Sequence, residues 1–366
     1  MYFKHKIFGA IFNFFTIFPL NNNKISFITD SNNSFNGNLD FINKELDNSG
    51  NYQYNYFFKD KFSIKSLYNL ATSKYIFLND NFFPLAFMNI KKNVKVSQLW
   101  HAPGAFKKFG ASVSNDSSEK EIIKKISNNT NYLFTSSDKI KNFYKEAFLI
   151  DEDKIMPLGT PRIDYYFKND LNLDSFKNDF LNKYPEAKGK KIVLYAPTFR
   201  DEEKFNNVFD YLDLNKFNEE LSNEYFFILR LHPKISKFAD LNFSNKNFLD
   251  LTDFENEQEL LLISDILITD YSSIMIEFAI LNKPIIFFAY DLDYYLSNDR
   301  GFYFDYEKNV PGVIVKNTDD LIETIKNNKF KNSKNQDFLN YQFNHLDDKS
   351  SSRIINFLLD NEGQND

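Results

Sequence analysis

Short apolar runs alternate with longer amphipathic stretches along this chain of 366 residues. Such an alternation is typical of parallel sheets that are covered by helices on both faces. The apolar runs predict strands over residues 24–29, 74–78, 96–100 and 131–135 in the first half, and over 191–196, 225–231, 266–269 and 285–289 in the second. The pattern therefore predicts an α/β protein with a group of strands in each half.

A polar, helical stretch over residues 169–190 separates the two groups of strands. A chain of this length exceeds what one hydrophobic core usually organises, so two domains are expected. We place the boundary within this stretch, which gives a first domain over residues 21–185 and a second over 186–366.

The first twenty residues form a separate segment, in which large apolar side chains recur at the spacing of one helix face. Lys4 and Lys6 lie near its start, Pro19 ends it, and no small-residue cleavage site of a signal peptide follows. Residues 1–20 are therefore expected to form an amphipathic helix that either packs on the body of the protein or lies on a membrane surface. No apolar stretch reaches the roughly 18–20 residues of a membrane-spanning helix.

The composition excludes several kinds of chemistry. The chain contains no cysteine, which excludes disulfides, thiolate metal sites and a cysteine nucleophile and agrees with a reducing cytoplasm. A formal net charge of −6 argues against a broad nucleic-acid-binding surface. The motifs GxxxxGK(S/T), GxGxxG and HExxH are absent from the sequence. Asp291 and Asp293 form a DxD-like pair, but we expect neither a metal site nor a cofactor.

Polar residues follow several of the predicted strands, and in open α/β sheets ligands bind beyond the carboxyl ends of the strands. One strand ends in Asp270, after which Ser272 or Ser273 opens a helix. Backbone N–H groups and two hydroxyls at a helix start suit a phosphate, although the same residues can simply cap the helix. Arg230 and His232 end another strand, where a cation and an imidazole suit a phosphate or a leaving group.

His101 follows a strand of the first half, on a turn that contains Pro103 and Gly104. A histidine in such a place is suited to proton transfer, because its pKa lies near working pH; a satisfied surface histidine is the alternative. Lys107 and Lys108 follow on a predicted helix, where they either contact an anionic acceptor or form a solvated face.

Three further residues are candidates for the site. Arg200 and Arg162 are placed to contact an anion or a base. Asp305 lies in an aromatic run and is assigned either a catalytic or a structural role.

Six stretches between residues 96 and 312 carry these candidates: QLWHAPGAFKKFG, PLGTPRIDYYF, LYAPTFRD, RLHPKI, ITDYSSIMIEFAILNKPIIFF and RGFYFDYEKNVPG. In this order they resemble the CDP-glycerol glycerophosphotransferase family of teichoic acid and capsule polymer synthesis. The resemblance implies a GT-B fold, with two Rossmann-like domains and the active site in the cleft between them. Many members have His-Gly-Thr where this chain has His101-Ala102-Pro103, so the acceptor and the alditol stay open.

The resemblance also implies roles for single residues. The second domain would hold CDP-glycerol, with Arg200 near the nucleotide and with His232, Ser272 and Ser273 on the diphosphate. Glu277, one helical turn further on, would either accept a hydrogen bond from the ribose or be solvated.

The implied reaction transfers glycerol phosphate, or a related alditol phosphate, from CDP-glycerol to an acceptor hydroxyl and releases CMP. His101 would be the base, and the acceptor would be lipid-linked, so we expect a cytoplasmic enzyme that is peripheral on the inner face of the membrane. The alternatives are a GT-B glycosyltransferase that uses a nucleotide sugar and a non-catalytic nucleotide-binding protein.

Overall fold

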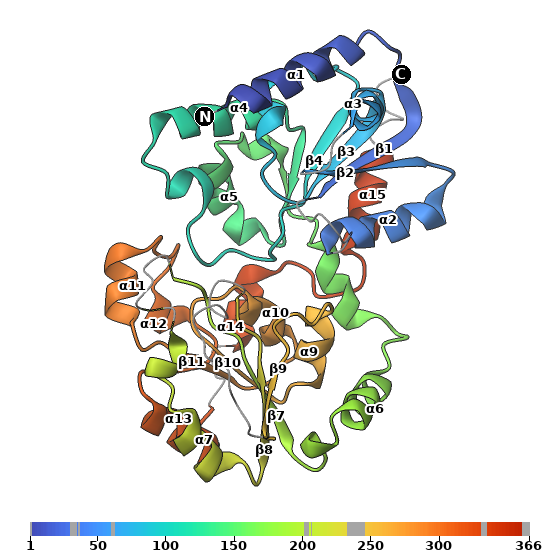
Figure 1. Ribbon diagram of the computed structural model, residues 1–366. Helices are drawn as coiled ribbons and strands as arrows, with labels where there is room; N and C mark the ends of the chain where they lie inside the picture. Colours follow the sequence, from blue (N-terminus) through green and yellow to red (C-terminus); the bar gives the residue numbers. More distant parts are fainter. Residues whose placement is uncertain are drawn as a thin grey trace. The chain divides into compact units, whose positions relative to one another are not determined.

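The computed structural model describes residues 2–29, 35, 37–59, 63–200, 205, 207–232, 246–330 and 335–360. The chain forms two compact units, each built on a parallel sheet of six strands (Figure 1). The first unit runs to Lys168 and takes up the chain again at Tyr341, and the second runs from Asn169 to Asn340.

The sheet of the first unit has the order β2-β1-β3-β4-β5-β6, with every pair parallel. Its strands are β1 Asn21–Thr29, β2 Gln53–Phe58, β3 Ser73–Leu78, β4 Lys95–Gln98, β5 Tyr132–Phe134 and β6 Ile155–Met156. Its helices are α1 Phe3–Phe15, α2 Asn38–Ser49, α3 Ile64–Ala71, α4 Ser117–Asn128, α5 Lys141–Phe148 and α15 Ser350–Asp360. Short 3-10 helices are η1 Phe83–Phe87, η2 Gly110–Ser112, η3 Asp138–Ile140, η4 Glu152–Lys154 and η5 Pro161–Phe167.

The sheet of the second unit has the order β12-β11-β10-β7-β8-β9 and is also parallel throughout. Its strands are β7 Lys191–Tyr195, β8 Tyr225–Leu229, β9 Phe248–Asp250, β10 Ile266–Thr269, β11 Ile285–Phe288 and β12 Val313–Val315. Helices of this unit are α6 Leu173–Lys183, α7 Leu214–Leu221, α9 Glu257–Ile263, α10 Ile274–Ile280, α11 Leu292–Asn298, α12 Tyr306–Asn309 and α13 Thr318–Lys326. Short 3-10 helices are η6 Pro185–Ala187 and η8 Val208–Asp210, and α14 Asn335–Gln342 spans the return to the first unit.

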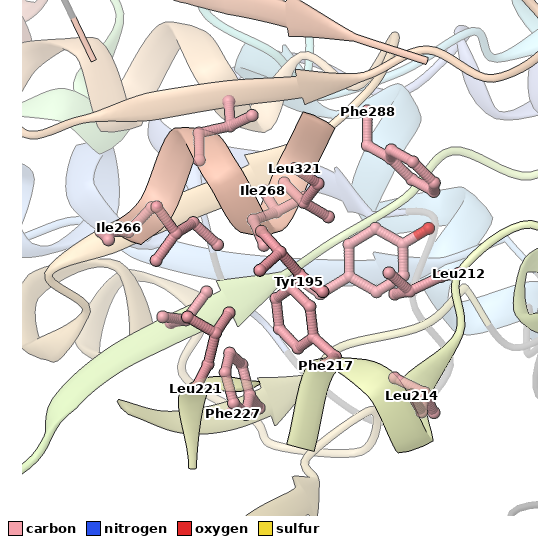
Figure 2. Packing of buried hydrophobic residues seen from close by; sticks show 14 of the residues in the cluster. Tyr195, Leu212, Leu214, Phe217, Leu221, Phe227, Ile266, Ile268, Phe288 and Leu321 are labelled. Carbon is pink, nitrogen blue, oxygen red and sulfur yellow. The ribbon is translucent and has the colours of Figure 1, made fainter. Parts of the chain in front are cut away.

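Apolar residues on both sides of the strands produce the core of the second unit. Tyr195, Phe227 and Ile268 point from three neighbouring strands into one cluster with Phe217 of α7 and Leu321 of α13 (Figure 2). Strands that are buried on both faces read as continuous apolar runs, which is why their positions were predictable.

All eight predicted strands are present, but several end earlier than expected. β4 ends at Gln98 instead of residue 100, because Trp100 has a left-handed backbone with a φ of 58°. β8 ends at Leu229, so Arg230 and His232 both follow the strand and do not share a face of it. The prediction missed β2, β6, β9 and β12, which are mostly short.

We predicted a second domain over residues 186–366. The last part of the chain instead belongs to the first unit, which takes up the chain again at Tyr341. α15 packs against α2 of the first unit, and its Ile354 and Leu358 are buried in the core of that unit. Asp164 of η5 holds the start of α15, because its carboxylate accepts hydrogen bonds from the backbone N–H groups of Ser350 at 2.9 Å and Ser351 at 2.8 Å.

The N-terminal helix packs on the first unit, which is one of the two arrangements that its sequence allowed; contact with a membrane surface stays a prediction. Phe8 and Phe12 of α1 are buried in the core of the first unit, and the ring of Phe8 lies edge-on to Phe82 with 5.8 Å between centroids. The opposite face leaves large side chains in solvent, with exposed fractions of 74% for Phe3 and 63% for Phe14. The described part of the chain contains no helix long and apolar enough to span a membrane.

Candidate active site

His101 lies at the carboxyl end of the first unit's sheet, just beyond β4, and its side chain is half-exposed at 49%. Its ring lies against Trp100, with 4.2 Å between the ring centroids. Its Nδ1 atom is 3.8 Å from Oδ1 of Asp80, which follows the neighbouring strand β3. Arg162 of η5 donates a hydrogen bond to the backbone carbonyl of His101 at 3.3 Å. The structure therefore brings two predicted site residues, His101 and Arg162, together.

Lys107 and Lys108 are not on a helix, which corrects the prediction. The chain bends through residues 101–104, where Gly104 has a φ of 67°, and then runs without regular helix to η2 at Gly110. The bend is held by buried polar contacts, since Tyr144 donates to the carbonyl of Gly104 at 2.7 Å. Both lysine side chains are partly exposed in this loop.

The loop after β10 carries the second group of candidates. Ser273 is the N-cap residue of α10 and makes no side-chain capping hydrogen bond, while Ser272 Oγ accepts a long one from the N–H of Ile274 at 3.4 Å. Both serines are partly exposed. Asp270 does not cap the helix: its Oδ1 accepts hydrogen bonds from the backbone N–H groups of Thr198 at 2.8 Å and of Tyr271 at 2.5 Å. The two hydroxyls therefore lie at the carboxyl end of the sheet without strong helix-capping bonds.

Arg200 is buried in the second unit, with 1% of its side chain exposed. Its Nε donates to Oδ2 of Asp291 at 2.7 Å, and its Nη2 donates to Oδ1 of the same residue at 2.9 Å. Nη1 forms an ion pair with Oδ2 of Asp270 at 2.9 Å. Burial opposes the charge of the guanidinium, but the two carboxylates more than offset it, so the pKa of Arg200 is raised above its ordinary value.

Aromatic rings complete the surroundings of this ion cluster. The guanidinium carbon of Arg200 lies 4.8 Å from the ring centroid of Tyr271, within the range of a cation–π contact. Tyr271 donates its hydroxyl to Oδ1 of Asp291 at 3.0 Å, and Tyr306 donates to the backbone carbonyl of Asp270 at 3.1 Å. The predicted contact of Arg200 with a nucleotide stays a prediction, but its donors are directed to protein carboxylates that fix the loop before Ser272.

Arg230 and His232 have different partners. Nη1 of Arg230 donates to the carbonyl of Phe254 at 2.9 Å, and Nη2 lies 3.5 Å from a carboxylate oxygen of Glu257. His232 is exposed, and its ring lies 5.5 Å from that of Phe199. Arg230 thus fixes the segment between β9 and α9, whereas His232 is accessible beyond the end of β8.

The two remaining carboxylates also have defined places. Glu277 is 3% exposed, so the alternative that it is a solvated surface residue is wrong. Asp305 is the N-cap residue of α12 and accepts a hydrogen bond from the N–H of Lys308 at 3.2 Å. The Lys308 side chain lowers the pKa of Asp305, which therefore stays ionised at neutral pH. This geometry agrees with the structural alternative for Asp305.

Asp291 and Asp293 do not face a common point. Asp291 binds Arg200, whereas the side chain of Asp293 is 93% exposed on α11 and lies 3.8 Å from Lys316. Within the described ranges, no three His, Asp or Glu side chains gather in a way that could hold a metal ion.

Comparison with known protein families shows to which family the chain belongs. The family model "CDP-Glycerol:Poly(glycerophosphate) glycerophosphotransferase" matches residues 10–360. The chain belongs to this family. Its predicted membership is thereby confirmed.

Two of the relatives from Bacillus spizizenii are named for ribitol phosphate. A teichoic acid poly(ribitol-phosphate) polymerase is 36% identical over 96% of this chain, and the match covers 59% of that protein. A teichoic acid ribitol-phosphate primase is 38% identical over 80% of this chain and 76% of its own length. The match with the polymerase therefore includes almost all of this chain but less than two thirds of the polymerase.

A solved structure of a variant of the wall teichoic acid polymerase TagF, soaked with CDPG, has a TM-score of 0.81 to this glycerophosphotransferase family member. The two are 25% identical, and the match covers 98% of this chain and 94% of that one. The predicted fold class, two α/β units on parallel sheets of the GT-B kind, is confirmed. The predicted function agrees with the names of these relatives.

Asp80 is a candidate that the sequence analysis missed. It follows β3, and His101 follows β4, the adjacent parallel strand. Because the carboxyl ends of parallel strands meet at one edge of a sheet, a search for charged residues after each predicted strand would have paired Asp80 with His101.

Proposed function

We propose that the protein transfers an alditol phosphate from a CDP-linked alditol to an acceptor hydroxyl and releases CMP. The family match over residues 10–360 carries the proposal. The acceptor oxygen bonds to the β-phosphorus, the bond from that phosphorus to the oxygen bridging the two phosphates breaks, and CMP leaves with the electron pair. His101 takes the proton of the hydroxyl.

The residues of each unit support different parts of this reaction. His101 is half-exposed and lies beside a carboxylate, an arrangement that suits a general base. His232 and the hydroxyls of Ser272 and Ser273 are accessible beyond the ends of β8 and β10, where a diphosphate would find hydrogen-bond donors. Phosphoryl transfer depends mainly on such positioning and charge stabilisation.

The test of His101 uses a second histidine as its control. His101→Ala should reduce turnover by roughly 10²-fold, the usual scale of losing a general base, and should leave donor affinity unchanged. His345→Ala, which removes an exposed histidine of the same unit, should retain full turnover. Near-normal turnover of His101→Ala would remove this residue from the mechanism.

The donor is tested by product analysis. The family is named for glycerophosphate, whereas the polymerase and the primase described above are named for ribitol phosphate, so CDP-glycerol and CDP-ribitol are compared directly. CMP release from either supports the proposal. UDP release from UDP-sugars, with no CMP from the CDP-alditols, would favour the glycosyltransferase alternative.

We also propose that the acceptor is lipid-linked and that the outer face of α1 rests on the membrane. Phe3 and Phe14 of α1 and Ile17 in the turn after it are 63–74% exposed, and Lys4 and Lys6 of α1 are also exposed. Burying one such side chain fully contributes roughly 1.5–3 kcal/mol, and nearby lysines add attraction to anionic headgroups. Together these side chains suit reversible attachment.

Substitution tests this attachment better than removal of residues 1–20, because Phe8 and Phe12 of that segment belong to the core. The double variant Phe14→Ser, Ile17→Ser should sediment less with phosphatidylglycerol vesicles than the unmodified protein. Leu296→Ser, which changes an exposed apolar residue on α11, is the control. Equal sedimentation of all three proteins would refute the attachment by α1.

A further inference from the structure

The carboxylate of Asp80 is held in place from several sides. Its Oδ1 accepts a hydrogen bond from the backbone N–H of Asn81 at 2.7 Å, and its Oδ2 lies 3.3 Å from Nζ of Lys59 at the end of β2. Buried Gln98 donates its amide to the carbonyl of Asp80 at 3.1 Å, and its amide oxygen accepts from the N–H of Trp100 at 2.9 Å. One glutamine side chain thus ties the loop after β3 to the loop after β4.

The backbone next to His101 is also held by a buried side chain. Asn38, which is fully buried at the start of α2, donates to the carbonyl of Trp100 at 2.6 Å and accepts from the N–H of Arg162 at 2.8 Å. Trp100 keeps a left-handed φ of 58°, which is uncommon for a bulky residue and needs support of this kind. The supported turn directs the imidazole of His101 to the Asp80 side of the sheet edge.

We infer that Asp80 is the positioning residue of His101. A carboxylate beside Nδ1 favours the tautomer with its proton on Nδ1, which leaves Nε2 as the basic nitrogen. The separation of 3.8 Å exceeds a hydrogen bond, but such contacts often tighten only when substrate is bound. The negative charge of Asp80 also stabilises the imidazolium that forms when His101 accepts a proton. This inference rests on the proposed role of His101 as the base.

Substitution of Asp80 and substitution of Lys59 should shift the pKa of His101 in opposite directions. Lys59 faces Asp80, and Arg162 faces the carbonyl of His101. Asp80→Asn removes the anion, so it should lower the pKa of His101 and shift the acidic limb of the kcat–pH profile to lower pH. Lys59→Met leaves that anion uncompensated, so it should raise the pKa of His101 and shift the same limb upward.

The experiment combines NMR titration with kinetics. The chain has four histidines, so the His101 resonance can be assigned by its loss in His101→Asn. We expect Asp80→Asn to reduce kcat by about tenfold or more while the KM for CDP-glycerol or CDP-ribitol stays unchanged, and Asp80→Glu to restore part of the loss. Asp40→Asn, which removes a partly exposed carboxylate paired with Lys44, is the matched control and should change neither readout.

The outcomes separate this inference from the proposed function. If His101→Ala is inactive but the His101 titration and kcat are unchanged in Asp80→Asn, the inference is wrong and the base assignment stands. Should Asp80→Asn fail to fold, an unshifted His101 titration in Lys59→Met would overturn the inference equally. Full turnover of His101→Ala would refute the base assignment itself, whatever Asp80 does to the titration.

Discussion

Arg200 is expected to stabilise the fold of the second unit rather than to contact a ligand. The variant Arg200→Met keeps an unbranched apolar chain but leaves Asp270 and Asp291 buried without their cation. Breaking a buried ion pair by removing one partner typically costs 3–5 kcal/mol, because an uncompensated charge remains. Domains commonly have about 5–15 kcal/mol of unfolding free energy, so this loss would be a large part of the total.

The assay must report on the second unit by itself. The one tryptophan of the chain, Trp100, belongs to the first unit, so its fluorescence does not serve. We would follow urea unfolding by hydrogen exchange of peptides over residues 266–281, which lie in the second unit. In Arg200→Met we expect a lower unfolding midpoint and faster exchange of these peptides, with little change over β3.

Two comparisons make the argument about Arg200 refutable. Lys216→Met breaks an ion pair with Asp319 that is short, at 2.6 Å, but exposed, and it should change the midpoint very little. The double variant Arg200→Met, Asp291→Asn should recover part of the loss, since one buried charge is gone. If Arg200→Met keeps its midpoint and loses only donor affinity, Arg200 contacts the nucleotide and the reasoning from burial is wrong.

Three other outcomes follow from the structure. Phe8→Ala should cost about 3–5 kcal/mol of unfolding free energy, as is usual for a buried phenylalanine, whereas Phe14→Ala on the exposed face of α1 should cost little; equal losses in urea unfolding would contradict the assigned faces. Burial raises the pKa of Tyr271, Tyr295 and Tyr306, so the stability that depends on their neutral form is complete below the ordinary tyrosine pKa near 10 and is lost as pH rises above it. Tyrosinate absorbance should therefore show these rings ionising only together with unfolding, and ionisation in the folded protein would contradict their burial. Turnover should survive EDTA, because Asp291 is bound to Arg200 and Asp293 points into solvent; loss of activity that Mg²⁺ restores would overturn this expectation.

The fold was largely predictable, because strands buried on both faces leave continuous apolar runs in the sequence. The misplaced elements have local physical reasons. The left-handed backbone of Trp100 ends β4 two residues early, and no pattern of apolar residues reports a φ angle. β2 escaped prediction because Gln53 and Asn55 interrupt its run, although Asn55 is buried and donates to Ser26 at 2.8 Å.

The sequence predicted which residues lie at the candidate site, but not what each of them binds. Arg200, Asp270 and Ser272 all follow strands at one edge of one sheet, so the sequence places them together without saying which of them reaches solvent. That depends on Asp291, which lies 91 residues after Arg200 and binds its guanidinium at two points. A charged residue after a strand is available to a ligand only if its polar atoms are not already bound to a residue from a distant part of the sequence. Sequence motifs therefore locate a site, and the partner of each polar atom decides whether a residue binds substrate or positions the residue that does.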